Sequence, residues 1–448
     1  MALTGIQIFK LLPKTNCGEC GVPTCLAFAM NLAAGKAELA ACRFITEEAK
    51  AMLSEASAPP IRPLAIGAGE NVVKIGGETV LFRHEKTFVN KPGLAMLITD
   101  GMAAAEVDAR LKRFKDLKYE WVGLTLRAEM IAVKNESGDA GKFEALVKKI
   151  KTETDAALIL MSDKVDAMTA AVKASADRVP LLYAATEPNC DAMAALAKEN
   201  KCPLVAKADS MEKLAALSDK LSAAGVKDIV LDSGARTLRR VFEDQVFIRR
   251  AALNQKNRSL GFPTITFPCE MTGDLMKETL IASTLIAKYA GIIVLSDFQG
   301  ESIFPLLVGR LNIYTDPQRP MMMQQGIYPI GNPTEDSPVL ITTNFALTYF
   351  IVSGEIEASR VPSWLLIMDT EGLSVLTAWA AGKFVGDAMG QFIKKCGITE
   401  KVKHRKVCIP GFVAAVSGDL EEELGPGWEV KIGPREAAHL SAFLKMGA

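Results

Sequence analysis

The stretch "ALILMSDKVDAMTAAVKASADRVPLLYAA", residues 157–185, decides how the middle of this chain folds. Two short apolar runs, 157–162 and 180–185, flank a segment whose apolar residues recur at helical spacing. A buried strand, a helix and a second buried strand form the unit from which parallel sheets are built. The sequence therefore predicts a parallel β-sheet with crossover helices in this part of the chain.

Similar apolar runs recur on both sides of this stretch, and helical patterns separate most of them. Eight strand candidates lie at 94–100, 121–127, 157–162, 180–185, 203–208, 228–234, 263–268 and 291–297. Eight strands that alternate with helices predict a (β/α)8 TIM barrel. Just before the first of them, "NVVKIGGETVLFRHE" (71–85) predicts a hairpin with a Gly-Gly turn.

The C-terminal part predicts a doubly wound, Rossmann-like α/β domain. Its strand candidates, each followed by a helical pattern, are 339–343, 364–369, 406–410 and 429–433. The pattern after the second is long, 373–396. Ligands bind such sheets at the carboxyl ends of the strands, and here these ends are rich in small and hydroxyl residues.

The same strand ends predict the kind of ligand. No charged residue lies between Asp336 and Glu355. Such a pocket suits a large, flat, nearly neutral ligand. Neither a G-x-G-x-x-G turn nor a Walker loop is present. The alternative is an ordinary α/β domain whose small residues serve helix–sheet packing.

Four cysteines crowd the N-terminus in "NCGECGVPTC" (16–25) and at Cys42, with the spacing C-x2-C-x4-C-x16-C. Structural zinc sites usually show two short knuckles, whereas iron–sulfur clusters take several thiolates from one compact loop and one from further on. The spacing favours a [4Fe–4S] cluster over zinc. Helices that Thr24 and Thr46 cap are predicted to bury it.

Composition excludes several classes of protein. Lys and Arg number 52, as do Asp and Glu, so no basic surface for nucleic acid or for a membrane is expected. The remaining five of the 9 cysteines are scattered, which does not fit a secreted disulfide scaffold. With no signal peptide and no long apolar run, a reducing cytoplasm and no membrane partner are expected.

Two segments rich in proline predict linkers, 54–64 and 314–338. They divide the chain into an iron–sulfur domain (1–57), a TIM barrel (65–313), a hinge linker (314–338) and a C-terminal domain (339–448). In the barrel, the residues offered at the strand ends are Asp100, Arg127, Ser162, Lys207, Asp232, Cys269 and Asp297. No histidine lies in 85–403, so the commonest general base is missing there. The barrel is therefore predicted to be a scaffold without catalytic residues.

The leader "LLPKTNCGECGVPTCLAFAMNLAAGKAELAAC" (11–42) resembles the cluster domain of the large (gamma) subunit of corrinoid iron–sulfur proteins. That family belongs to the acetyl-CoA decarbonylase/synthase system of the reductive acetyl-CoA, or Wood–Ljungdahl, pathway, and its domain order matches this whole chain. The resemblance implies two sites. A [4Fe–4S] cluster would be ligated by Cys17, Cys20, Cys25 and Cys42. A cobamide would be bound by Leu340, Thr343, Asn344, Ala346, Thr348, Thr370, Glu371, Gly372, Leu373, Ser374, Val375, Ala378, Pro410, Gly411, Gly433, Pro434 and Arg435.

The resemblance also implies a function, that of a methyl carrier. The corrinoid Co(I) would accept methyl from methyl-tetrahydrofolate on a separate methyltransferase and deliver it to the nickel site of acetyl-CoA synthase. The cluster would return Co(II) to Co(I). The motif D-x-H-x-x-G, whose histidine binds cobalt in many cobalamin domains, is missing, so the cobamide is expected base-off.

The implied partners are a small corrinoid iron–sulfur protein subunit in a heterodimer, the methyltransferase, acetyl-CoA synthase, and a reductive activator or ferredoxin. Two other readings stay open. In one, the chain is a complete corrinoid-dependent methyltransferase, a transferase with the pterin bound on its own barrel. In the other, it is an iron–sulfur electron-transfer protein whose C-terminal domain only docks partners.

Overall fold

The computed structural model describes residues 5–33, 37, 39–46, 48–50, 53, 59–121, 124–316 and 320–447. Parts of the predicted iron–sulfur domain and residues 317–319 of the predicted hinge lie outside the described residues. The chain divides into two compact units. Unit 1 comprises Met1–Leu81, Val89–Phe114 and Ala128–Leu306, and unit 2 comprises Phe82–Phe88, Lys115–Arg127 and Leu307–Ala448.

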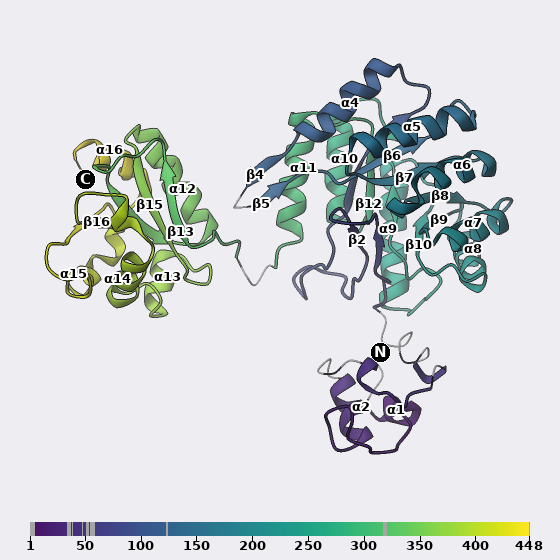
Figure 1. Ribbon diagram of the computed structural model, residues 1–448, viewed down its shortest axis with the longest axis horizontal. Helices are drawn as coiled ribbons and strands as arrows, with labels where there is room; N and C mark the ends of the chain where they lie inside the picture. Colours follow the sequence, from purple (N-terminus) through teal and green to yellow (C-terminus); the bar gives the residue numbers. More distant parts are fainter. Residues whose placement is uncertain are drawn as a thin grey trace. The chain divides into compact units, whose positions relative to one another are not determined.

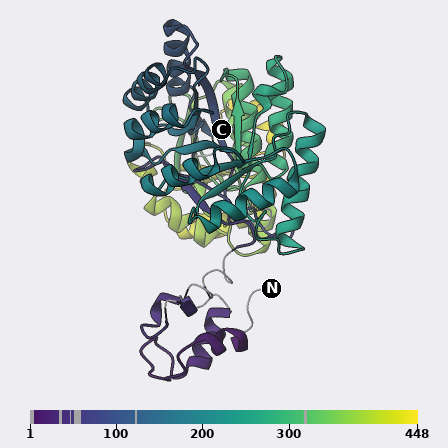
Figure 2. The same ribbon diagram turned by 90° about the vertical axis from the view of Figure 1, so that its right-hand side faces the viewer.

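The N-terminal segment of unit 1 is helical. Its elements are α1 (Gly5–Leu11), α2 (Cys25–Ala33) and the short η1 (Leu39–Ala41); α1 and α2, purple in Figure 2, pack against each other. The Thr24 hydroxyl accepts a hydrogen bond from Ala27 N at 3.1 Å, and the Thr46 hydroxyl accepts one from Ala49 N at 3.2 Å. Both predicted helix caps are therefore confirmed.

Eight parallel strands form the centre of unit 1. They are β3 (Gly93–Thr99), β6 (Met130–Lys134), β7 (Ala157–Met161), β8 (Leu181–Ala185), β9 (Leu204–Lys207), β10 (Ile229–Asp232), β11 (Ile265–Thr266) and β12 (Ile292–Leu295). Their order is β10-β9-β8-β7-β6-β3-β12-β11. A single parallel bridge between Leu231 and Thr264 brings β10 beside β11, so the sheet is a nearly closed barrel, as the sequence predicts.

Helices alternate with these strands and cover the outside of the sheet (Figure 1). They are α4 (Ala104–Asp116), α5 (Ala140–Glu153), α6 (Val165–Ser175), α7 (Cys190–Asn200), α8 (Met211–Ala223), α9 (Leu238–Leu253), α10 (Leu275–Ala287) and α11 (Gly300–Ile313), with the short η2 (Ala176–Arg178) and η3 (Pro268–Glu270). Asp139, Ser210 and Asp274 each accept a hydrogen bond from the backbone N–H three residues further on. These side chains fix where α5, α8 and α10 begin.

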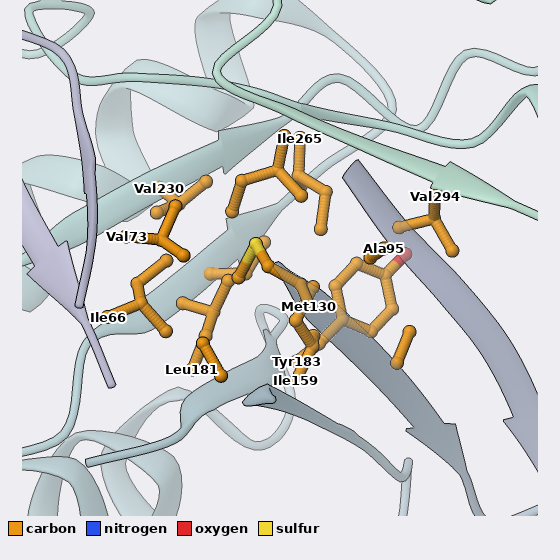
Figure 3. Packing of buried hydrophobic residues seen from close by; sticks show 14 of the residues in the cluster. Ile66, Val73, Ala95, Met130, Ile159, Leu181, Tyr183, Val230, Ile265 and Val294 are labelled. Carbon is orange, nitrogen blue, oxygen red and sulfur yellow. The ribbon is translucent and has the colours of Figure 1, made fainter. Parts of the chain in front are cut away.

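Alternate residues of the barrel strands point inward and fill the barrel with apolar side chains, among them Met130, Ile159, Leu181 and Tyr183 (Figure 3). The short strands β1 (Leu64–Ile66) and β2 (Val73–Ile75) add to the same cluster. They close its N-terminal end, because a Cβ placed on Gly93, the first residue of β3, would lie 3.1 Å from the Val73 side chain. The opposite, carboxyl end is left for a ligand.

The predicted hairpin over 71–85 is wrong in its pairing. β2 pairs antiparallel with β1, which precedes it, and not with the residues after the Gly-Gly pair. Gly76 and Gly77, with φ of 77° and 83°, instead lead the chain away from β2. The strand β2 pairs with β1 because the inward residues of both strands are buried in the same apolar cluster.

The predicted barrel strand 121–127 is also wrong. Here β4 (Tyr119–Trp121) and β5 (Leu124–Leu126) pair antiparallel as a separate two-stranded sheet. The barrel strand that follows β3 is β6, whose Met130–Val133 are fully buried, whereas Leu124 is half exposed. A continuous buried run, rather than an alternating one, marks the strand that belongs inside a parallel barrel.

Unit 2 contains a sheet of five strands. They are β13 (Gly326–Ile330), β14 (Val339–Thr343), β15 (Ser363–Met368), β16 (Lys406–Ile409) and β17 (Glu429–Ile432). The order is β13-β15-β14-β16-β17; β13 runs antiparallel and the others are parallel. The four predicted strands of this region are therefore confirmed, and β13 is an addition within the predicted linker.

Apolar clusters cover both faces of this sheet. One face packs against α12 (Ala346–Ser359) and α16 (Leu440–Lys445). The other packs against α13 (Val375–Ala380), α14 (Gly386–Lys395), η4 (Ile398–Glu400), η5 (Gly411–Val416) and α15 (Ser417–Leu424). The short η6 (Ala437–His439) precedes α16. Figure 1 shows these helices in green and yellow around the strands.

The long helix predicted over 373–396 is interrupted. α13 ends at Ala380, because Lys383 N and Phe384 N both donate to the carbonyl oxygen of Ala378 and Gly382 takes φ of 71°. Hydrogen bonds of this kind close a helix with a left-handed residue. The short α13 therefore stays at the carboxyl end of β15. None of the helices in the described part of the chain is long and apolar enough to cross a membrane.

Candidate functional site

The four N-terminal cysteines lie around one small apolar cluster. Cys25 and Cys42 are buried in it, Cys20 packs against it, and Cys17 is exposed. Cys25 is the first residue of α2, and its Sγ accepts a hydrogen bond from Asn16 N at 3.4 Å. The Asn16 side chain accepts one in return from Cys25 N at 2.8 Å. These two bonds fix the start of the cysteine loop against the helix.

This loop bends sharply. Lys14, Asn16, Gly18 and Gly21 all have positive φ, and Gly21 N donates to the carbonyl oxygen of Gly18 at 3.0 Å. A Cβ on Gly18 or Gly21 would meet no atom within 4 Å. In the described residues no three His, Cys, Asp or Glu side chains are arranged to hold a metal ion. The sulfurs share one module and one chemistry, but they are not gathered into a ligand set.

The carboxyl edge of the unit 2 sheet has a crevice where the strand order reverses. β14 and β16 are neighbours, but β14 leads into α12 on one face and β16 into η5 on the other. In open α/β sheets ligands bind at such a point, because the two loops diverge there.

Two buried hydroxyls at this point lack a hydrogen-bond partner in the described residues. They are the Oγ1 atoms of Thr342 and Thr343, at the end of β14. Successive residues of a strand face opposite sides of the sheet, so Thr342 points toward the α12 face and Thr343 toward the α13 face. Because a buried hydroxyl without a partner is costly, this pair indicates a polar ligand at the strand end.

A cavity of about 140 Å³ opens beside Thr342. It is mostly apolar and lies between the strands β14 and β16 and the helices α12 and α16. Seven of the seventeen predicted corrinoid contacts line it: Leu340, Thr348, Val375, Pro410, Gly433, Pro434 and Arg435. Sequence reasoning missed Thr342, Cys408 and Phe412, which line it as well. The cavity is far smaller than a corrin ring, so it suits only a side arm of one.

A network around Asn344 joins several other predicted residues. Its Oδ1 accepts hydrogen bonds from Thr370 N and Gly372 N, each at 3.0 Å, and from the Thr370 hydroxyl at 3.1 Å. Its Nδ2 donates to Asp369 at 2.9 Å. The Thr370 hydroxyl also lies 3.1 Å from the carbonyl oxygen of Leu373, so its single proton is shared between the two acceptors. One amide thus ties the loop after β14 to the loop after β15.

The loops after β16 and β17 are in backbone contact. Gly411 N donates to the carbonyl oxygen of Pro434 at 3.1 Å, and Gly433 N to that of Ile409 at 2.9 Å. A Cβ on Gly411 would lie 2.4 Å from the carbonyl oxygen of Gly433. Only glycine permits this approach, and it brings Pro410 and Arg435 to the same cavity.

Gly372 has a constraint that the sequence does not show. We expect from the sequence that this glycine lets the backbone approach a ligand. In the structure its φ is 74°, and a Cβ there would lie 2.7 Å from Cγ of Met322. Met321 and Met323 are bound to the loop after β14, because Ala346 N donates to Met321 O and Met323 N to Asn344 O. The backbone conformation and this packing together favour glycine at 372, and no contact with a ligand is needed to explain it.

The remaining predicted contacts serve mainly local structure. Ala378 is fully buried in α13. The Ser374 hydroxyl lies 3.0 Å from that of Thr377, and Glu371 pairs with Lys383. Around them, large apolar residues that follow the strands are exposed to solvent: Leu347, Leu376, Trp379 and Phe412. They make the carboxyl edge an apolar rim, which suits a flat ligand.

Neither His404 nor His439 lines the cavity beside Thr342. His404 precedes β16, at the opposite edge of the sheet, and its two ring nitrogens lie 2.9 Å from Ser337 O and 3.2 Å from Lys406 N. His439 is exposed, while its neighbours Ala437 and Leu440 line the cavity.

Most of the side chains predicted at the carboxyl ends of the barrel strands make contacts that stabilise the fold. Burial acts to raise the pKa of Asp100, but hydrogen bonds from Ser137, Asn135 and Glu136 outweigh it and lower that pKa. Asp297 pairs with Arg113 at 2.7 Å, and the Ser162 hydroxyl donates to Asn135. Arg127 follows β5 and not a barrel strand.

Asp232 belongs to a buried network at the same end. It accepts a hydrogen bond from the Tyr183 hydroxyl at 2.7 Å and pairs with Arg236, which also pairs with Glu270. Burial and the charge of Asp232 raise the pKa of Tyr183 far above its ordinary value, so the phenol stays a donor. Burial likewise raises the pKa of Cys269, to about 12, so it is no thiolate nucleophile.

Two family models match the chain. One, described as the CO dehydrogenase/acetyl-CoA synthase delta subunit, matches residues 63–444. The other, for a proposed Fe–S cluster, matches residues 12–44 and so contains all four clustered cysteines. Among solved structures, dihydropteroate synthase from Vibrio fischeri is 15% identical with a TM-score of 0.39, and the match covers 54% of this chain and 100% of that one.

Relatives match over almost the full length. The corrinoid/iron-sulfur protein large subunit of Moorella thermoacetica is 44% identical over 445 residues, 99% of this chain and 99% of that protein. The acetyl-CoA decarbonylase/synthase complex subunit gamma of Methanopyrus kandleri is 35% identical over 455 residues, 99% of this chain and 97% of that protein. The chain therefore belongs to the family of large (gamma) subunits of corrinoid iron–sulfur proteins of the acetyl-CoA decarbonylase/synthase system.

Proposed function

We propose that the chain is a methyl carrier that holds a corrinoid at the carboxyl edge of the unit 2 sheet and a [4Fe–4S] cluster at the N-terminal cysteines. Full-length similarity to a corrinoid/iron-sulfur protein large subunit supports both cofactors. When bound, a corrinoid supplies a nucleophilic cobalt for methyl transfer, and an iron–sulfur cluster supplies single electrons. The chain itself supplies position, apolar surroundings and exclusion of water.

The observation that carries this proposal is the pair of hydroxyls at the end of β14 that lack a partner in the described residues: that of Thr342 lines an apolar cavity, and that of Thr343 lies on the other face of the same strand end. Corrinoids carry amide side arms, which donate and accept hydrogen bonds. The hydroxyls would bind such arms, while the apolar rim of Trp379 and Phe412 would contact the ring. The Asn344 network would hold the loops after β14 and β15 in place beneath it.

We place the cluster ligands at Cys17, Cys20, Cys25 and Cys42. Their donor chemistry fits, because all four are free thiols in one short module, and thiolates are the ligands of iron–sulfur clusters. Exposed Cys17 lies on the solvent side of that module, where an electron-donating partner would have access.

The corrinoid would be held base-off. His404 lies at the far edge of the sheet, and the exposed His439 does not line the cavity, so we expect neither to bind cobalt. With no histidine donor from this chain, the ligand field would favour the reduced metal. The cavity beside Thr342 would then take the arm that bears the lower base.

The family to which the chain belongs also suggests its partners. The relative from Methanopyrus kandleri is named as a subunit of a complex. We infer that this chain pairs with a small corrinoid iron–sulfur subunit and meets a methyl-tetrahydrofolate methyltransferase, acetyl-CoA synthase and a reductive activator or ferredoxin in turn. The division into domains 1–57, 65–313 and 339–448 would serve these encounters. Because β13 pairs with β15 and Met321–Met323 is bonded to the loop after β14, a hinge within 314–338 would lie before Met321.

A coupled assay tests the function. Labelled methyl-tetrahydrofolate, the methyltransferase, acetyl-CoA synthase, carbon monoxide, coenzyme A and a reductant are combined with or without the chain. Label is expected in acetyl-CoA only when the chain and the methyltransferase are both present. Label transfer to the chain without the methyltransferase would show a complete methyltransferase, and transfer to acetyl-CoA without the chain would refute the carrier role.

A further inference from the structure

The carboxyl end of the barrel in unit 1 has a cavity that methyl carriage does not use. Its volume is about 600 Å³, and it lies at the ends of β8, β9 and β10, with α8 as one wall. Cavities of this size hold small molecules. In (β/α)8 barrels, ligands bind at this end of the strands.

Lys207 is the one cavity-lining lysine that has no acidic partner in the described residues. It is the last residue of β9, is half-buried, and places its ammonium 5.3 Å from the centre of the Tyr183 ring. No hydrogen bond or ion pair joins that ammonium to any described residue. Because a half-buried charge is normally paired, a lysine without an anionic partner in the described residues can bind an anion that enters the cavity.

The nearest buried carboxylate cannot neutralise Lys207. Asp232 is its register partner on β10, so the two side chains leave the sheet on the same side. The oxygens of Asp232 accept hydrogen bonds from Tyr183, Gly234 and Arg236, at 2.7 to 3.1 Å. Asp232 is thereby satisfied, and its charge is already paired.

The other lysines of the cavity have partners. Lys213 pairs with Asp209 at 2.9 Å, and Lys220 pairs with Asp191 at 2.9 Å. Of the three lysines that line the cavity, Lys207 is therefore the one whose charge is unpaired in the described residues.

We propose that this cavity binds a small anionic metabolite through a phosphate or carboxylate group at Lys207. A lysine ammonium recognises such a group as a point charge. Glu187, which has no cationic partner at hydrogen-bond distance in the described residues, offers an acceptor for a hydroxyl or amino group of the same molecule. The site lies in the barrel and is separate from the cysteine module and from the unit 2 sheet.

Titration calorimetry on the full chain at low ionic strength tests this site, with inorganic phosphate in one arm and citrate in the other. At least one anion is expected to bind saturably at one site, and the arm that binds assigns the group. Lys207→Met should weaken binding about tenfold or more, whereas Lys207→Arg should bind within a few-fold of the unchanged chain. Added chloride should weaken binding, because the contact is ionic.

Lys173→Met is the matched control, since Lys173 is an exposed lysine in the last turn of α6. It should bind anions as the unchanged chain does. The proposal is overturned if neither anion binds saturably, if Lys207→Met binds unchanged, or if Lys173→Met loses as much. Cobalt and iron contents should be equal in all variants, which separates this site from the proposed methyl carrier function.

Discussion

The side-chain oxygen of Asn344, at the end of β14, accepts a hydrogen bond from the backbone N–H of Thr370, at the end of β15. The bond is 3.0 Å long and both residues are buried. Through it, and through its bond to Gly372 N, one amide sets the distance between two loops at the carboxyl edge of the unit 2 sheet. Binding at this edge should therefore depend on Asn344 even though its polar atoms face the protein.

Asn344→Ala should destabilise unit 2 by about 2–3 kcal/mol, because it leaves buried donors of Thr370 and Gly372 without an acceptor. Corrinoid retention should fall with it. All four tryptophans of the chain lie in unit 2, so their fluorescence during urea unfolding reports on this unit. Gln325→Ala removes a single exposed bond to Asp369 N and serves as the control. If Asn344→Ala and Gln325→Ala lost equal amounts of stability and of corrinoid, the Asn344 network would not have this role.

Thr342→Val and Thr343→Val should each stabilise the cofactor-free chain by about 1 kcal/mol, since each removes a buried hydroxyl that has no partner. The same variants should retain less corrinoid. Ser363→Ala is the control, because its hydroxyl donates to Val361 O at 3.0 Å, at the other end of β15. It should lose stability and keep the corrinoid. Full cobalt content in both threonine variants would show that the hydroxyls are not ligand contacts.

Gly372→Ala and Gly397→Ala form a matched pair. Both glycines have positive φ, 74° and 85°, which costs about 1 kcal/mol for alanine. Only Gly372 has a neighbour, Met322, in the way of a Cβ. Gly372→Ala should therefore lower the free energy of unfolding by about 1 kcal/mol more than Gly397→Ala does. Adding Met322→Ala to Gly372→Ala should remove this difference. If the two glycine variants unfold alike, the contact with Met322 imposes no constraint.

Cys20→Ala should lose the iron–sulfur cluster and keep the corrinoid, because Cys20 packs in the N-terminal apolar cluster whereas the proposed corrinoid site lies in unit 2. Iron and cobalt analysis of the purified variant checks this. Cys190→Ala, in the buried face of α7, is the control and should keep both metals. Joint loss of cobalt and iron in Cys20→Ala would show that the two sites are not independent.

The barrel could be predicted because its strands are continuous buried runs separated by amphipathic helices. The failure at 121–127 has the same cause. The strand β5 has Leu124 exposed and Leu126 buried, whereas Met130–Val133 is a short run that is buried throughout inside the parallel sheet. Both stretches are short and apolar, and the register with β3 and β7 shows which one belongs to the barrel.

The sequence indicates which segments contain the candidate site, but not what each residue in them does. The strand ends could be read from the sequence, and Thr343 among them. Thr342 was missed, since the sequence does not reveal which hydroxyls fail to find a partner. The sequence predicts that Asn344 and Gly372 face a ligand. In the structure the Asn344 amide accepts a hydrogen bond from Thr370, and Gly372 packs against Met322. Such contacts join segments far apart in the chain, which no local pattern encodes.

The central claim is that one chain holds both a corrinoid and a [4Fe–4S] cluster. The measurement that tests it most directly is metal analysis, with a visible spectrum, of the chain purified without oxygen. The account predicts corrinoid bands with about one cobalt and about four irons per chain. Iron without cobalt or corrinoid bands, even after incubation with a cobamide, would contradict it and leave an electron-transfer protein.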